Sequence, residues 1–325
     1  MVDETYVVGV DGGATKTVAL IGTRARILGR GESGSSNYHN IGTVAAGRAI
    51  RTAVAKAKIQ ARLRGRRVET AVVALAAIDS AEGFRIARRF VRRANLAQEA
   101  FVIHDSVAAL YAATRGRPGI IVNSGTGCFA AGINQAGEYV RVGGWGYLID
   151  DKGSAFDIGM KAISSGFRMT DGRVRRTRLM TLLKKKLAVR RFDEIVDVIY
   201  SNRIGVEEIA ELAPSVSKAA SKDRVCRQIL REAGASIAEL ASTAARRLKL
   251  TNTAFPLAMV GGVFRSGPYF VEPFTSRVRD ECPQARLLRL EEEPARGAYL
   301  IAVKLARQGL KALPQNDRWL RTVVH

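Results

Sequence analysis

Short apolar runs and amphipathic stretches alternate along the first third of the chain. The apolar runs predict strands at residues 6–10, 17–22, 27–31, 70–75 and 100–103. Between them Ala, Ile and Leu recur at helical spacing, which predicts helices at residues 44–64, 81–94 and 106–114. Three strands are thus followed by alternating helices and strands, and this order predicts a mixed α/β domain.

The stretch RGRPG at residues 115–119 separates this part from a second set of predicted elements. We expect strands at residues 120–123, 128–134 and 138–142, helices over 157–249, an apolar strand at 255–260 and an amphipathic helix at 294–307. In both halves a strand ends in a polar glycine turn and a second strand follows. The chain therefore contains a weak internal repeat.

Length and composition fit a folded protein of two domains. The chain has 325 residues, of which 47% are apolar and 25% are charged. The N-terminus shows no basic segment before a long apolar run, and the longest apolar run, at residues 70–78, is too short to cross a bilayer. Three widely spaced cysteines without a C-x-x-C motif suit a reducing compartment. We therefore expect a cytoplasmic protein that does not enter membranes.

The chain is strongly basic, with a formal net charge of +22 and a pI of about 10.6. Such a charge attracts polyanions at low salt. The arginines and lysines form clusters, but no nucleic-acid-binding motif accompanies them. We expect most of them to lie on solvated helix faces and loops, and we expect no nucleic-acid partner.

Two polar turns rich in glycine give the first chemical signal. They read DGGATKT at residues 11–17 and NSGTGC at 123–128, and neither is a P-loop. The letters GTGCFA at 125–130 match the dinucleotide fingerprint, but that motif must open a helix, whereas a strand-like run follows here. Such turns can grip a triphosphate with backbone N–H groups and hydroxyls. An ordinary hairpin turn uses glycine in the same way.

Seven motifs, in order, resemble one protein family. GVDGGATKT (9–17), NSGTGC (123–128) and MVGGVF (259–264) are similar to the phosphate-1, phosphate-2 and adenosine motifs of the actin/Hsp70/sugar-kinase superfamily. GSSNYHNIG (34–42), LAAIDS (75–80), HDSVAAL (104–110) and GGWGYLIDDKGSAFDIG (143–159) are similar to its N-acetylglucosamine kinase branch, the BadF/BadG-type ATPase family. The resemblance spans residues 6–305.

The resemblance implies an α/β fold of two ribonuclease-H-like (actin-like ATPase) domains with a cleft between them. The first domain would comprise residues 1–113, with a C-terminal helix at 296–325 packing back on it, and the second would comprise 114–295. A homodimer is implied, as is ATP as co-substrate with Mg²⁺, which Asp11 would hold through water. The residues implied to bind ATP are Asp11, Gly12, Gly13, Thr15, Lys16, Thr17, Ser124, Gly125, Thr126, Gly127, Gly261 and Gly262.

For the sugar, the resemblance implies that Asp105 is the catalytic base, which takes the proton of the 6-hydroxyl as that oxygen attacks the γ-phosphorus. Plainer interpretations are an N-cap for Asp105, a turn residue for Asn37 and a core residue for Trp145. We expect His104 to be a satisfied histidine at a strand end. The residues implied to bind sugar are Ser36, Asn37, Ala77, Asp105, Gly144, Trp145, Gly146 and Asp151.

The sequence departs from the family pattern at two places near the expected sugar site. The family's GDEGS reads DDKGS at residues 150–154, and Ala76 and Ala77 stand where relatives often carry Ser and Gly. A reversed charge at Lys152 can alter which sugar substituent is accepted. We therefore predict a kinase for N-acetylglucosamine or a related hexose or hexosamine, and a broad-specificity hexokinase stays open.

Two other functions stay open on the sequence. A sister branch of the family activates 2-hydroxyacyl-CoA dehydratases or benzoyl-CoA reductase through an iron–sulfur cluster held by cysteines, but only Cys128 lies near a motif here. A non-catalytic module that binds ATP or sugar would not need Asp105. Hexose-dependent ADP release would separate a kinase from both.

Overall fold

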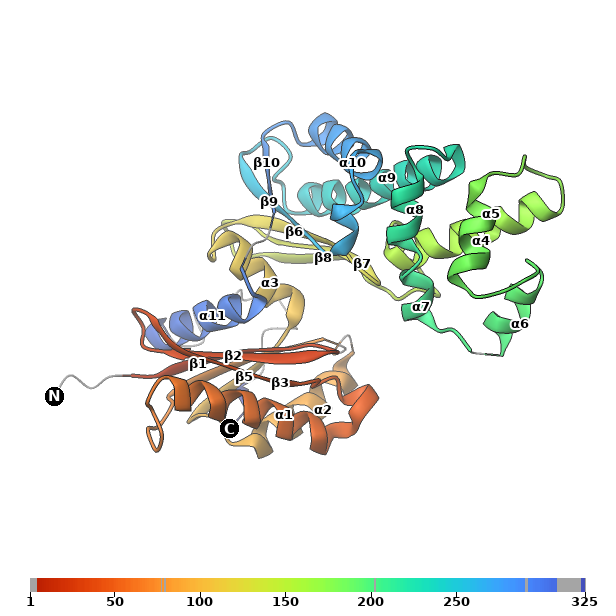
Figure 1. Cartoon of the computed structure of the whole chain (residues 1–325). Coiled ribbons are helices and arrows are strands. Elements are labelled where there is room, and N and C mark those ends of the chain that lie inside the picture. The colour runs from red at the N-terminus through yellow and green to blue at the C-terminus, as the bar shows by residue number, and fades with distance from the viewer. Residues whose placement is uncertain are drawn as a thin grey trace. The chain divides into compact units, whose positions relative to one another are not determined.

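The computed structural model describes residues 5–76, 78, 80–201, 203–289, 292–308 and 323–324. The chain divides into two compact units (Figure 1). The first unit comprises Met1–Gly119, Ile133–Tyr139 and Leu290–His325, and the second comprises Ile120–Gly132 and Val140–Arg289. The domain boundaries that we expected, at residues 113 and 295, remain a prediction. The compact units end several residues away from these positions.

The first unit is built on a six-stranded mixed sheet of order β11-β5-β4-β1-β2-β3. Strands β1, β2 and β3 form an antiparallel meander, β4 and β5 run parallel to β1, and β11 pairs antiparallel with β5. The strands are β1 (Val7–Gly12), β2 (Lys16–Gly22), β3 (Ile27–Gly34), β4 (Thr70–Leu75), β5 (Glu99–His104) and β11 (Val323–Val324).

Helices cover both faces of this sheet, because successive residues of its strands point to opposite sides. On β1, Val8 and Val10 pack in one core and Val7 packs in another. The helices are α1 (Tyr38–Gln60) and α2 (Ala81–Ala94) on one face, and α3 (Asp105–Thr114) and α11 (Pro294–Gln308) on the other (Figure 1). Helix α11 lies so close to β1 that a Cβ at Gly9 would be 2.0 Å from the backbone N of Tyr299.

Two features explain where the first helix departs from its predicted range. It begins at Tyr38 instead of Val44, because the Asn37 side chain accepts a hydrogen bond from the backbone N–H of His39 and caps it. Gly42 then interrupts the helical dihedrals with a φ of 77°. Because the first turn is polar and Gly42 interrupts the helix, the apolar periodicity in the sequence begins only after the true start of the helix.

The second unit holds a five-stranded sheet of order β10-β9-β6-β7-β8 and most of the helices. Its strands are β6 (Gly119–Ser124), β7 (Cys128–Ile133), β8 (Tyr139–Gly143), β9 (Phe255–Val260) and β10 (Ala285–Arg289). Its helices are α4 (Ala155–Thr170), α5 (Arg178–Lys186), α6 (Glu194–Tyr200), α7 (Val206–Ala210), α8 (Ala213–Ala219), α9 (Arg224–Arg247), the 3₁₀ turn η1 (Gly262–Arg265) and α10 (Pro268–Glu281).

The sequence argument missed β10 and α10. Strand β10 is a charged edge strand without apolar alternation, and α10 contains Pro273, a residue that argues against a helix interior. Tertiary packing overrides both signals. The α10 residues Phe270 and Phe274 are fully buried against Phe264, and Gly234 lets the backbone of Phe270 approach α9 closely.

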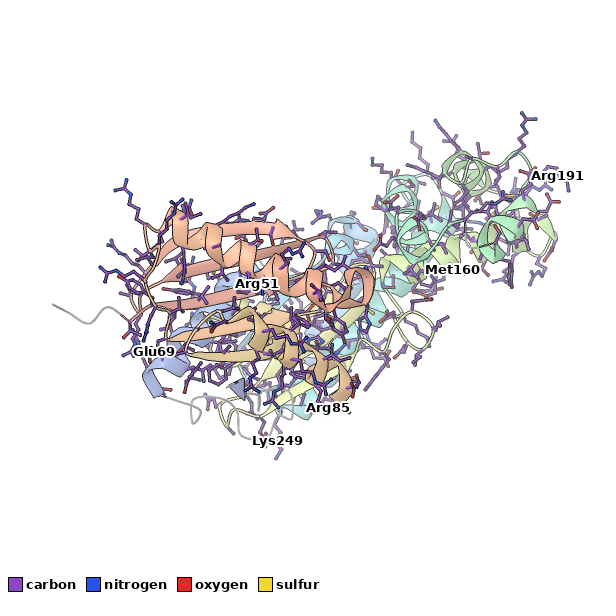
Figure 2. The ribbon with its side chains drawn as sticks, turned by 90° about the horizontal axis from the view of Figure 1, so that it is seen from below. Arg51, Glu69, Arg85, Met160, Arg191 and Lys249 are labelled. Atoms are coloured by element: carbon purple, nitrogen blue, oxygen red, sulfur yellow. The ribbon has the colours of Figure 1, made fainter. Side chains whose placement is uncertain are left out.

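Charged side chains cover the outer surface. Figure 2 shows them on both units, with Arg51 on α1, Arg85 on α2 and Arg191 in the helical part of the second unit. All three arginines are exposed. Of the helices that the structure describes, none is both long enough and apolar enough to cross a membrane.

Candidate active site

The first glycine turn (residues 12–16) joins β1 to β2 in the first unit. The backbone N–H of Gly13 donates to the Lys16 carbonyl at 3.0 Å and closes the turn. Gly12 must lack a side chain, since a Cβ there would lie 2.3 Å from Ser36 Oγ and 2.6 Å from Leu75 Cδ2. Thr15 and Lys16 are exposed at the tip. The turn therefore presents backbone, a hydroxyl and one ammonium group to solvent.

A serine-rich loop supports this turn from behind. The backbone N–H of Ser36 donates to the Gly13 carbonyl at 3.2 Å. Ser36 is buried, and its hydroxyl has no hydrogen-bond partner among the described residues. Thr17, which we expected at the phosphates, is fully buried, and its hydroxyl donates to the Gly34 carbonyl at 2.8 Å. The Thr17 hydroxyl is thus used to join β2 to β3.

Asn37 lies beside Ser36 at the start of α1. Its Oδ1 accepts the backbone N–H of His39 at 3.1 Å, so that the residue is a helix N-cap. Within the described structure the amide nitrogen of Asn37 has no hydrogen-bond partner, which leaves two donors available. Ala77, also expected at the sugar, lies outside the described residues.

Three parallel strands bring two carboxylates to one edge of the first sheet. Gly12 of β1 pairs with Leu75 of β4, and Leu75 pairs with His104 of β5. Asp11 and Asp105 therefore both lie where these strands end. Burial first, and then the charges of Asp105 and Glu293, raise the pKa of Asp11 to about 7, and Lys16 opposes this shift.

Asp105 is the first residue of helix α3, and the N-cap is His104, whose Nδ1 accepts the backbone N–H of Ser106 at 3.1 Å. The N-cap interpretation of Asp105 is therefore wrong. Its side chain is 34% exposed, and its Oδ1 lies 2.8 Å from His104 Nδ1. That nitrogen is engaged by Ser106, and the buried Oδ1 forms no hydrogen bond with a described residue. His104 itself is buried and satisfied, as we expected.

Sequence reasoning missed a charged pair beside Asp11. Arg30 on β3 binds Glu293 with two hydrogen bonds, of 3.0 Å from Nε and 2.7 Å from Nη2, and Nη2 also contacts Glu32 at 2.7 Å. The hydrogen bond from Arg30 lowers the pKa of Glu293 and keeps that carboxylate charged. Since Glu293 comes from the segment before α11, no local pattern could place it near β1.

The second glycine turn (residues 123–128) joins β6 to β7 in the second unit. The N–H of Gly125 donates to the Gly127 carbonyl at 2.9 Å, and the Gly125 carbonyl accepts the Ala155 N–H at the start of α4. Ser124 is buried and its hydroxyl donates to the Gly153 carbonyl, whereas Thr126 is exposed. A strand follows this turn, which confirms that GTGCFA is not a dinucleotide fingerprint.

Asp151 lies against this second turn. It is buried, and its Oδ1 accepts the backbone N–H of Cys128 at 3.4 Å. A Cβ at Gly127 would lie 2.9 Å from Asp151 Oδ2. Burial is the main cause that raises the pKa of Asp151. The structure thus places this predicted sugar ligand as a support of the glycine turn.

The third glycine turn (residues 261–262) follows β9 in the same unit. Gly261 has a φ of 99°, and a Cβ there would be 2.1 Å from the Ser124 carbonyl oxygen. Gly262 opens the 3₁₀ turn η1. The second and third turns therefore contact each other, because they follow β6 and β9, which pair in parallel. Only glycine permits this approach.

The segment Gly144–Gly146 leaves β8 as an open loop. Arg141 donates to the Gly144 carbonyl at 2.9 Å and fixes its base. Trp145 is 68% exposed, so its interpretation as a core residue is wrong. The exposed indole of Trp145, between Gly144 and Gly146, can therefore contact a ligand at the surface of the second unit.

The cysteines do not form a metal site. Cys128, Cys226 and Cys282 are free and buried, and burial raises the pKa of each thiol. In the part of the chain that the structure describes, no group of three His, Cys, Asp or Glu side chains could hold a metal ion.

Two sheet-based units with glycine turns at the ends of their first strands define the class of actin-like ATPases and sugar kinases. Solved structures share this fold. One is a ROK family glucokinase from Streptomyces griseus in complex with glucose and AMPPNP, with a TM-score of 0.53 and 19% identity over 94% of this chain and 100% of that one. The predicted fold class is confirmed.

The chain belongs to the BadF/BadG/BcrA/BcrD ATPase family, whose profile matches residues 8–302. An N-acetylmuramic acid/N-acetylglucosamine kinase from Clostridium acetobutylicum is 28% identical over 91% of this chain and 98% of its own. An N-acetyl-D-glucosamine kinase from Dictyostelium discoideum is 26% identical over 91% and 97%. A proposed N-acetylglucosamine kinase from Chromobacterium violaceum has a TM-score of 0.73 and 25% identity, over 92% of this chain and 99% of that one.

Proposed function

We propose that this protein is an ATP-dependent sugar kinase that phosphorylates the 6-hydroxyl of N-acetylglucosamine or a related hexose or hexosamine. The observation that carries this proposal is Asp105, a part-exposed carboxylate whose buried Oδ1 lacks a hydrogen-bond partner among the described residues. It shares one sheet edge with Asp11 and the first glycine turn. The names of the two kinase relatives from Clostridium acetobutylicum and Dictyostelium discoideum support it.

Asp105 would orient the attacking alcohol. The 6-oxygen forms a bond to the γ-phosphorus, the bond from that phosphorus to the β–γ bridging oxygen breaks, and ADP leaves with that oxygen. The hydroxyl proton passes to the Asp105 carboxylate. In a loose phosphoryl-transfer transition state, positioning and charge stabilisation contribute more than the strength of the base.

Two of the glycine turns carry groups that are suited to a nucleotide. The first turn offers the backbone of Gly13, the hydroxyl of Thr15 and the ammonium of Lys16. The second offers the backbone at Gly125 and the exposed Thr126. Backbone N–H groups and a single cation are suited to phosphate oxygens. The third turn, at Gly261 and Gly262, would accept the adenosine part.

The charges around Asp11 fit a bound Mg²⁺. Burial and two further carboxylates already disfavour a negative Asp11, and a divalent cation would relieve this excess of negative charge. Mg²⁺ often keeps several waters and needs few protein ligands, so one carboxylate can suffice. When bound, the ion would neutralise charge on the transferring phosphates.

For the sugar, we infer that the Ser36 hydroxyl, the Asn37 amide nitrogen and the Trp145 ring are available polar and apolar partners. Asp150 and Lys152, where the sequence departs from the family pattern, are both exposed and so are accessible to a ligand. Asp151 would contribute through the second glycine turn that it supports. A homodimer and a cytoplasmic location stay predictions.

A substrate panel tests the proposal. We expect ADP release that depends on an added sugar, measured across N-acetylglucosamine, N-acetylmuramic acid, N-acetylmannosamine, glucosamine, glucose and mannose, with the product mapped to the 6-position by NMR. An Asp280→Asn variant is the matched control for Asp105→Asn, because it removes an exposed carboxylate of α10 that has no part in the proposed site. ATP hydrolysis that no sugar stimulates would contradict a kinase.

A further inference from the structure

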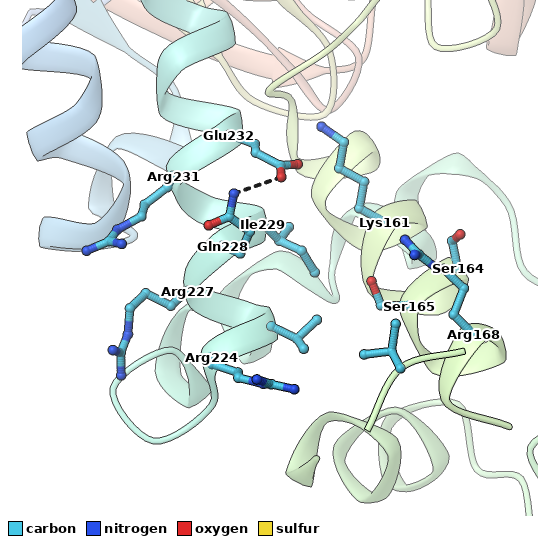
Figure 3. A pocket seen from close by; sticks show the side chains of 12 residues that line it. Lys161, Ser164, Ser165, Arg168, Arg224, Arg227, Gln228, Ile229, Arg231 and Glu232 are labelled. Carbon is cyan, nitrogen blue, oxygen red and sulfur yellow. Dashed lines mark hydrogen bonds between the residues drawn. The ribbon is translucent and has the colours of Figure 1, made fainter. Parts of the chain in front are cut away.

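A pocket of about 560 Å³ lies wholly within the second unit, between α4 and the first turns of α9 (Figure 3). This volume is in the range of small-molecule sites. Helix α4 rises about 1.5 Å per residue, so Arg168 in the pocket is roughly 20 Å along the helix from Ala155, which contacts the second glycine turn. None of the residues that line the pocket belongs to the glycine turns.

Two unpaired arginines face this pocket from different helices. Figure 3 shows the side chains of Arg168 on α4 and Arg224 on α9 among those that line the pocket. Neither guanidinium has an ion pair or a hydrogen bond with any residue that the structure describes, and both arginines are exposed. Of the other charged groups at the rim, Lys161 pairs with Asp157 at 2.9 Å and Arg227 donates to the carbonyls of Ala220 and Ser221. Glu232 accepts a hydrogen bond from Gln228 at 3.0 Å, and Arg231 is a third arginine of the lining.

The pocket also offers neutral partners. The hydroxyls of Ser164 and Ser165 lie on its α4 side and have no hydrogen bond within the described structure. Val225 and Ile229 supply an apolar side on α9. Guanidinium groups and hydroxyls are hydrogen-bond donors suited to the oxygens of a phosphate dianion, which can accept from more than one arginine.

The start of α9 is held rigidly, which fixes Arg224. The buried Asp223 carboxylate accepts the N–H groups of Val225 and Cys226 on α9 and of Leu179 on α5. Burial alone would raise the pKa of Asp223, but these hydrogen bonds and one from Thr177 lower it. The first amides of α9 are thus occupied by Asp223, and recognition of an anion here would rest on side chains.

We propose that this α4–α9 pocket is an accessory binding site for the phosphate group of a small phosphate ester such as a sugar phosphate. Inorganic phosphate carries the same group and is the second source of that chemistry. The proposal does not depend on the kinase activity, because no residue of the candidate active site contributes to the pocket.

Hydrogen–deuterium exchange of the full chain gives a local test. Peptides covering residues 158–170 and 224–235 are followed with glucose 6-phosphate, with inorganic phosphate and with neutral glucose. The test variant is R168Q/R224Q. The matched control is R92Q/R93Q, which removes the same charge from two exposed arginines of α2, neither of which lines the pocket. Thermal melting of both variants verifies that they fold.

We expect both phosphate ligands, but not glucose, to slow exchange in the two peptides. The R168Q/R224Q variant should need roughly tenfold or more ligand for the same protection, and the control should match the wild type. Tighter binding of glucose 6-phosphate identifies an ester site, and equal binding identifies a site for free phosphate. Absence of protection, or equal protection in R168Q/R224Q, would overturn the proposal.

Discussion

Asp11 lies near the end of β1 and Asp105 directly follows β5, the two strands that flank β4, and the charge of Asp105 adds to burial in raising the pKa of Asp11 to about 7. Two carboxylates at one sheet edge would repel each other unless a cation or a proton were shared nearby. The fold therefore holds an unfavourable pair of like charges at the place where the proposed reaction needs a cation beside Asp11 and a carboxylate at Asp105.

Replacing Asp105 by Asn should lower kcat by about 10²–10⁴-fold, because the amide cannot take the hydroxyl proton. Nucleotide affinity should change little, since the glycine turns stay intact. Steady-state kinetics and calorimetric titration with an ATP analogue separate the two effects. Near-normal turnover would remove Asp105 from the role of base.

Nucleotide binding should depend on pH through Asp11. The pKa of Asp11 lies at about 7 in the absence of metal, so the carboxylate is neutral below that pH and cannot attract Mg²⁺. We expect the affinity for Mg²⁺–ATP to fall from pH 8 to pH 6, and the midpoint to move to lower pH as Mg²⁺ is raised. The Asp11→Asn variant should show a flat profile, and an unchanged slope in that variant would contradict the assignment.

The same residue should cost the protein stability above neutral pH. The folded protein keeps the Asp11 proton up to a pKa of about 7, whereas the unfolded chain releases it near the ordinary value of 3.8. The folded state thus binds more protons in this window, and stability falls as the pH rises through it. Asp11→Asn should raise the free energy of unfolding at pH 8 without Mg²⁺ by on the order of 1–4 kcal/mol, and hardly at pH 4. Denaturant melts at both values measure this.

Gly261→Ala should weaken nucleotide binding by displacing the second glycine turn, since the new Cβ would lie 2.1 Å from the Ser124 carbonyl oxygen. Gly267→Ala is a matched control, because its φ of 85° is also left-handed but nothing lies within 4 Å. Both variants should lose about 1 kcal/mol of stability from backbone strain. Only Gly261→Ala should lose affinity for ATP, and equal affinities would show that the contact is unimportant.

The hydroxyls of Ser36 and Thr17 should behave in opposite ways. Ser36→Ala removes a buried hydroxyl that has no hydrogen-bond partner among the described residues, so we expect unchanged or higher stability. We also expect a higher KM for the sugar. Thr17→Val leaves the Gly34 carbonyl without its donor and should cost about 1–2 kcal/mol with little direct effect on KM. Melting curves and sugar KM values for both variants test this contrast. A Ser36→Ala enzyme with normal KM would exclude Ser36 from the sugar site.

Local signals were sufficient for much of the fold. Strands β4 and β9 and helix α2 have the predicted bounds, because their apolar patterns coincide with buried positions. The sequence also placed glycines at the turns between strands, where steric limits leave few alternatives. What it missed, such as α10 with Pro273, forms because packing against Phe264 outweighs a poor local propensity.

The amino-acid sequence by itself determined most of the order of elements and the first two glycine turns, since these depend on residue type and spacing. Its resemblance to a known family added the third turn and Asp105 as the candidate base. Only the tertiary structure decided that Thr17 and Asp151 support the turns, that Glu293 and Arg30 lie beside Asp11, and that Arg168 and Arg224 face one pocket. The physical reason is that burial, hydrogen-bond partners and mutual charge are properties of distant segments brought together, which no local pattern records.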